Sequence, residues 1–132
     1  MAFVTADRVL DTSTSTGTGA MTVSGTASSG YRTFSAVMSV NDTCYYSIGH
    51  QTLNEWETGT GTYSSLNTLT RTTISASSNS NSATNFSVGT KDVSITLLSS
   101  KTAQSNPAGQ LINAGSSSAG SNIFLADFFG GF

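Results

Sequence analysis

The chain has 132 residues, of which 36% are hydrophobic and 9% are charged, and its formal net charge is −2. A chain of this size buries one modest core, so we expect one compact domain with an extension. Its few basic residues are scattered singly and no long apolar stretch occurs, which excludes a nucleic-acid footprint and a membrane anchor; no secretion signal is expected either.

Hydroxyl side chains dominate the composition. Serine and threonine make up about a third of the residues, whereas the charged fraction lies far below the quarter that is usual in soluble domains. Hydroxyl groups form hydrogen bonds across protein contacts without the desolvation cost of ions. The composition therefore suits a protein that is held at high density in an assembly.

Alternation of apolar and polar residues with period two predicts a sheet protein, and no helix-period stretch occurs. Threonine-rich, glycine-punctuated runs strengthen this prediction, because β-branched side chains favour extended backbone. The expected strands are residues 8–12, 20–24, 33–38, 43–48, 55–63, 69–75 and 91–98. About seven short strands predict an all-β fold, either a small antiparallel β-sandwich or a barrel.

Two strands show which side chains face the core. Residues 91–98 place Val93, Ile95 and Leu97 on one face, and residues 43–48 place Cys44, Tyr46 and Ile48 inward. The lone tryptophan is interpreted as a core or inter-subunit packing residue, although an exposed tryptophan can stack on a sugar. The predicted packing residues are Trp56, Tyr46, Val93 and Ile95.

The candidates for chemistry are few. Cys44 has no partner for an intramolecular disulfide and is interpreted as a buried structural thiol of a protein folded in a reducing cytoplasm. His50 is the single histidine, and with Cys44 it lacks the further soft ligands that zinc requires. We expect no metal and no cofactor.

Three carboxylates raise the alternative of glycoside cleavage. Asp42, Glu55 and Glu57 are the candidates, and Glu55 and Glu57 share one face of a strand. Exposed acidic residues beside a core tryptophan explain this spacing equally well, so no catalytic residue is predicted. The Gly17-Thr18-Gly19 and Gly59-Thr60-Gly61 runs lack the lysine of a phosphate loop and are interpreted as bulges or close backbone approaches.

After Ser99 the composition changes. Residues 1–99 form the predicted β-rich domain, and residues 100–132 an extended Gly/Ser-rich arm that contains Pro107 and ends in an apolar segment. Such a segment must dock on a surface, and the length of the arm favours a neighbouring polypeptide. The predicted docking residues are Ile123, Phe124, Leu125, Phe128, Phe129 and Phe132.

A series of spaced residues within positions 4–98 carries a family resemblance. In order, they are Ala6-Asp7-Arg8-Val9, Gly17-Thr18-Gly19, Gly30-Tyr31, Phe34, Tyr45-Tyr46, Ile48, Trp56-Glu57, Gly59-Thr60-Gly61-Thr62-Tyr63, Leu69, Arg71, Ser77-Ser78-Asn79, Asn85-Phe86 and Gly89-Thr90-Lys91-Asp92-Val93. The series resembles a short β-rich domain common in virion structural proteins of tailed bacteriophages. The first block departs from the family by alternating threonine with serine, and the arm lies outside the resemblance.

The resemblance implies a non-enzymatic virion protein, made in the host cytoplasm and assembled into the particle. The short chain, the lack of a fibre repeat and the apolar segment favour a capsid decoration or cement protein that contacts the major capsid protein or other virion proteins. A homo-oligomer, specifically a trimer, follows from what decoration and fibre proteins commonly form. The alternative is a tail or fibre component with host-glycan adhesion.

Overall fold

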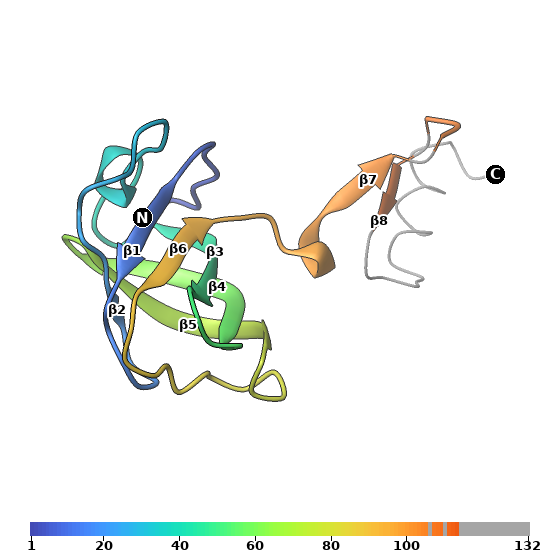
Figure 1. Cartoon of the computed structure of the whole chain (residues 1–132). Helices are drawn as coiled ribbons and strands as arrows, with labels where there is room; N and C mark the ends of the chain where they lie inside the picture. Colours follow the sequence, from blue (N-terminus) through green and yellow to red (C-terminus); the bar gives the residue numbers. More distant parts are fainter. Residues whose placement is uncertain (106, 110, 114–132) are drawn as a thin grey trace. The chain divides into compact units, whose positions relative to one another are not determined.

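The computed structural model describes residues 1–105, 107–109 and 111–113. The chain divides into two compact units, Met1–Thr96 and Leu97–Phe132 (Figure 1). The strands of the first unit are β1 (Leu10–Ser13), β2 (Met21–Thr22), β3 (Thr43–His50), β4 (Trp56–Ser65), β5 (Thr68–Ser77) and β6 (Lys91–Ile95). Within the second unit, the described residues form the 3-10 turn η2 (Ser99–Lys101) and the antiparallel pair β7 (Ala103–Ser105) and β8 (Leu111–Asn113).

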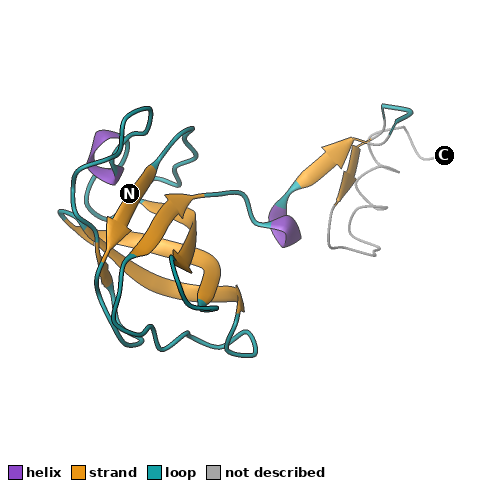
Figure 2. Cartoon of the chain, viewed as in Figure 1, coloured by secondary structure: helices purple, strands orange, loops and turns teal. Residues whose placement is uncertain are grey.

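The six strands of the first unit form one antiparallel sheet in the order β1-β6-β3-β4-β5-β2. Its two outer strands approach one another, because Ser13 bridges Val23 and the Ser24 amide donates to the Thr12 carbonyl at 2.8 Å. The sheet therefore curls into a nearly closed barrel, and the predicted all-β class is confirmed (Figure 2). In the described part of the chain, no helix is long and apolar enough to cross a membrane.

Side chains that alternate between inward and outward positions along β3 and β6 form part of the barrel interior. In β3 the side chains of Cys44, Tyr46 and Ile48 are fully buried, as the sequence predicted. Val93 of β6 is also fully buried, and Ile95 is partly buried against the same core cluster. These apolar side chains leave water together, which is the main favourable contribution to folding.

Residues 33–38 do not form the predicted strand. They contain the 3-10 turn η1 (Phe34–Ala36), because the Thr33 hydroxyl accepts a hydrogen bond from the Ala36 amide at 3.2 Å and caps the turn. Phe34 still reaches the core. The last predicted strand is also shorter than expected: β6 ends at Ile95, and Leu97 is exposed rather than on the core face.

Trp56 does not belong to the core of the chain, so the core half of its prediction is wrong, and packing between subunits stays a prediction. Its side chain is 41% exposed, because β4 points Glu57, Gly59, Gly61 and Tyr63 inward and thereby turns Trp56 outward.

The inward glycines of β4 make room for Tyr46. A Cβ on Gly59 would lie 2.1 Å from the Thr73 carbonyl oxygen, and one on Gly61 would lie 3.0 Å from the Tyr46 ring. The sheet register also shifts next to both glycines. The predicted close approach is confirmed at this run, and it explains why the interior face of β4 carries so little side-chain volume.

Candidate functional site

A buried ion pair occupies the barrel interior. Arg71 Nη1 lies 2.7 Å from Glu57 Oε1, and both side chains are almost fully shielded from solvent. The Tyr46 hydroxyl donates to the other carboxylate oxygen at 2.5 Å, and the Thr84 amide donates to Oε1 at 2.8 Å. Burial and the adjacent Glu57 carboxylate raise the pKa of Tyr46 well above its ordinary range. Every described partner of the Glu57 carboxylate is therefore a hydrogen-bond donor from the protein itself.

The same arginine joins loops to the barrel. Its guanidinium donates to the carbonyls of Gly17, Gly19 and Thr84 at 2.9–3.0 Å. The group also lies 5.3 Å from the centre of the Phe86 ring, within cation–π range. Because the guanidinium donors are directed at protein acceptors, the arrangement is a structural brace and not a ligand site.

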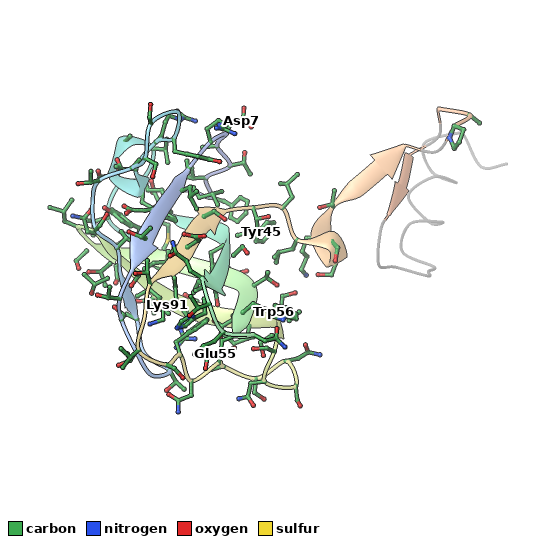
Figure 3. The ribbon with its side chains drawn as sticks, viewed as in Figure 1. Asp7, Tyr45, Glu55, Trp56 and Lys91 are labelled. Carbon is green, nitrogen blue, oxygen red and sulfur yellow. The ribbon has the colours of Figure 1, made fainter. Side chains whose placement is uncertain are left out.

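One end of the barrel collects a second set of charged groups (Figure 3). Lys91 is fully buried and donates to the Ser15 carbonyl at 2.7 Å. Burial lowers the pKa of Lys91, while nearby Glu55 acts in the opposite direction. Glu55 accepts hydrogen bonds from the Ser87 amide and hydroxyl at 2.9 and 2.7 Å, and these bonds lower the pKa of its carboxyl group. The buried Lys91 amine is therefore not accessible to a substrate, and both carboxylate oxygens of Glu55 already accept hydrogen bonds.

His50 and Cys44 play separate structural roles. The Nδ1 atom of His50 accepts from the amides of Thr52 and Leu53 at 3.1 and 3.2 Å, so Nε2 carries the proton that is donated to the Val88 carbonyl at 2.9 Å. Cys44 is buried, as predicted, and burial raises its pKa to about 12. Among the described residues, no group of three or more histidine, cysteine or acidic side chains is placed to bind a metal.

Each of the three carboxylates considered for catalysis accepts hydrogen bonds from the protein, as described above for Glu55. Asp42 accepts from the Ser39 and Ala2 amides at 2.9 and 2.8 Å, which lowers the pKa of its carboxyl group. Glu57 is buried against Arg71, so the prediction of an exposed acid beside a core tryptophan is wrong for this residue. Trp56 is the exposed residue and Glu57 the buried one, because consecutive residues of one strand face opposite sides of the sheet.

The outer face of β6, β3 and β4 is a candidate surface for contacts with other molecules. Strand registers align its outward side chains in rows across β6, β3 and β4. Successive rows are Asp92, Gly49 and Trp56, then Ser94, Ser47 and Thr58. The following outward pair is Tyr45 and Thr60, and the next is Thr43 and Thr62. Asp92 is the single charged residue in these rows, and Figure 3 shows Trp56 and Tyr45 along this side.

A hollow of about 330 Å³ also lies beside the start of β1. It is lined by Arg8, Tyr31 and Ile95 among others, and the Arg8 guanidinium stacks 4.1 Å from the centre of the Tyr31 ring. Arg8 adopts a positive φ of 62° and donates through Nε to the Gly30 carbonyl at 3.1 Å. The hydrogen bond and the stacked ring hold this arginine at the rim of the hollow.

The predicted docking residues of the apolar segment, positions 123–125, 128, 129 and 132, lie outside the described residues. Neither the family models nor the curated proteins nor the solved structures compared with the chain give a match.

Proposed function

We propose that the chain is a non-enzymatic structural protein of a tailed-bacteriophage virion, specifically a decoration or cement protein that coats or stabilises the head. The observation that carries the proposal is the outer face of β6, β3 and β4, where three consecutive rows carry only hydroxyl side chains and no charge: Ser94, Ser47 and Thr58, then Tyr45 and Thr60, then Thr43 and Thr62. Such a surface can pack against protein without burying unpaired ions. The resemblance of positions 4–98 to virion domains supports the same assignment.

In this proposal the barrel associates with copies of itself, as a trimer, and the apolar segment at positions 121–132 anchors each copy on the major capsid protein or another virion protein. The sequence of that segment supports the role, because its large apolar side chains require a surface to cover them. Many weak anchors in one shell add through multivalency.

Deletion of residues 121–132 tests the anchor. We expect the truncated protein to keep the circular dichroism spectrum of a β-protein while failing to join particles at the occupancy of the full chain. Full occupancy after deletion would show that the segment is not the anchor, and unfolding would show that the segment belongs to the core of its own chain.

A tail or fibre component is the second candidate, and the exposure of Trp56 favours it because an exposed aromatic ring can contact a host surface. Quantitation of the protein in purified virions separates the two roles. A decoration protein occurs in many copies per head, whereas a tail component occurs in few.

A further inference from the structure

The row formed by Asp92, Gly49 and Trp56 contains an open space where β3 ends and where β4 and β6 begin. Gly49 is the direct partner of Trp56 on one side and of Asp92 on the other. A Cβ built on Gly49 would meet no atom within 4 Å, so the neighbouring indole does not cover this position. Two strand spacings separate the backbones of Trp56 and Asp92 by about 10 Å. The surface therefore has an aromatic wall, a bare backbone floor and an acidic wall.

Hydrogen bonds fix the backbone of Trp56 and the carboxylate of Asp92. The Trp56 amide donates to the Ser78 hydroxyl at 3.0 Å, and its carbonyl accepts from the Ser78 amide and the Thr84 hydroxyl, both at 3.0 Å. On the other side, the Gln51 side-chain amide donates to Asp92 Oδ1 at 3.0 Å. The backbone that carries the indole is thus fixed, and the carboxylate is oriented before any ligand arrives, which lowers the ordering cost of binding.

We propose that this platform, defined as Trp56, Gly49, Asp92 and Gln51, binds a neutral saccharide. A pyranose ring has an apolar C–H face that fits an aromatic ring, and its edge carries hydroxyl donors that suit a carboxylate and an amide oxygen. The side chains of the neighbouring row, Ser94, Ser47 and Thr58, all carry hydroxyl groups. The acidic wall disfavours phosphorylated or acidic ligands, so nucleic acid and uronic acids do not fit.

The platform does not depend on the position of the protein in a particle. A decoration protein and a tail protein would both present it to bacterial surface polysaccharide, and repeated copies would raise weak single-site affinity by avidity. Failure of saccharide binding would leave the assembly proposal intact, because that proposal is tested by deletion of residues 121–132.

Trp56 is the single tryptophan of the chain, so its fluorescence reports on the platform directly. The experiment titrates the full-length protein with oligomers of glucose and of N-acetylglucosamine and screens it on an array of bacterial surface polysaccharides. We expect a saturable change in emission with at least one of these neutral saccharides. No saturable response and no array signal would overturn the proposal.

Gly49→Thr is the decisive variant. Gly49 has no positive φ and no neighbour within 4 Å of a Cβ, so threonine is accommodated by the fold but fills the floor of the platform. We expect affinity to fall at least about tenfold, or 1.4 kcal/mol, in Gly49→Thr and, on the array, in Trp56→Ala. Trp56→Phe keeps an aromatic wall, so its affinity on the array should stay within about threefold of that of the parent chain.

Leu66→Ala is the matched control, because Leu66 is an exposed apolar residue in the turn between β4 and β5 and lies outside the platform. It should bind as the parent chain does. Saccharide binding that survives both Gly49→Thr and Trp56→Ala would place the site elsewhere and overturn the proposal. An emission change that follows protein concentration alone, together with self-association lost in Trp56→Ala, would identify the platform as a contact between copies and overturn it as well.

Discussion

Removal of the Arg71 guanidinium should be among the most damaging single changes to the barrel. Arg71→Met keeps an apolar stem beside Phe86 but removes the counter-charge of buried Glu57 and the donors to the loop carbonyls. Glu57 retains hydrogen bonds from Tyr46 and Thr84, so the cost arises chiefly from the uncompensated charge. Removing one partner of a buried pair costs about 3–5 kcal/mol. Against a typical total of about 5–15 kcal/mol, this is a large fraction of the stability.

Urea unfolding followed by far-ultraviolet circular dichroism is the suitable assay, because urea leaves ionic strength unchanged. We expect Glu57→Gln alone to cost less, about 1.5–3 kcal/mol, since Arg71 keeps its carbonyl acceptors. The double variant should be more stable than the sum of the single changes predicts, by at least about 1 kcal/mol. Arg32→Met is the control: this exposed arginine bonds the Asp7 carbonyl, and its loss should cost under about 1 kcal/mol.

A cost below about 1 kcal/mol for Arg71→Met would refute this reasoning. Strict additivity in the double variant would refute it too, because the two side chains would then act independently.

Four further predictions follow from burial and backbone geometry. Trp56→Ala should cost less than about 1 kcal/mol by thermal unfolding, well short of the roughly 3–5 kcal/mol of a core aromatic, and a larger loss would mean that the indole is packed. Cys44, whose pKa is raised by burial to about 12, should resist iodoacetamide at pH 8 until the protein is unfolded in urea; labelling of the folded protein at the unfolded rate would contradict its burial. Burial lowers the pKa of Lys91 below the unfolded value of about 10.4, so the unfolded chain binds more protons and this residue contributes stability that rises with pH up to that value. The difference in urea midpoint between Lys91→Met and the parent chain should therefore shift between pH 7 and pH 10 in favour of the parent, and a constant difference would argue against the lowered pKa. Gly59→Ala should lose about 1–3 kcal/mol because its Cβ meets a backbone carbonyl, whereas Gly49→Ala, in open space, should be close to neutral by the same urea assay; equal effects would contradict the packing around β4.

Part of this molecule was predictable because alternation is a local property. Tyr46 and Val93 could be placed in the core from the strands that carry them. Trp56 was placed wrongly, although β4 contains the information: Trp56 and Tyr63 are seven residues apart, so a regular strand cannot face both inward. Only one of the two rings can be buried by this strand, and the chain buries Tyr63.

The buried ion pair could not be predicted from alternation. Arg71 faces inward like Leu69, two residues before it, but its register partner on β4 is Gly61 and not Glu57. The register between β4 and β5 shifts at two points between Arg71 and the partner of Glu57, and such bulges leave no clear mark in the sequence, so the pairing of these two side chains could not be predicted. The Thr33 cap was missed for a related reason: a hydroxyl that bonds a backbone amide three residues ahead competes with strand formation over a stretch that otherwise alternates.

The position of β6 in the strand order has a consequence for the order of folding. Lys91–Ile95 pairs with β1 on one side and with β3 on the other, although both of these strands precede it by dozens of residues. During synthesis, β1 and β3 therefore leave the ribosome with unpaired edges, and the closing strand comes last. Long-range pairing of this kind is slow and leaves strand edges exposed in the meantime. A nascent chain that ends before residue 91 cannot complete the barrel, so closure is coupled to the emergence of β6.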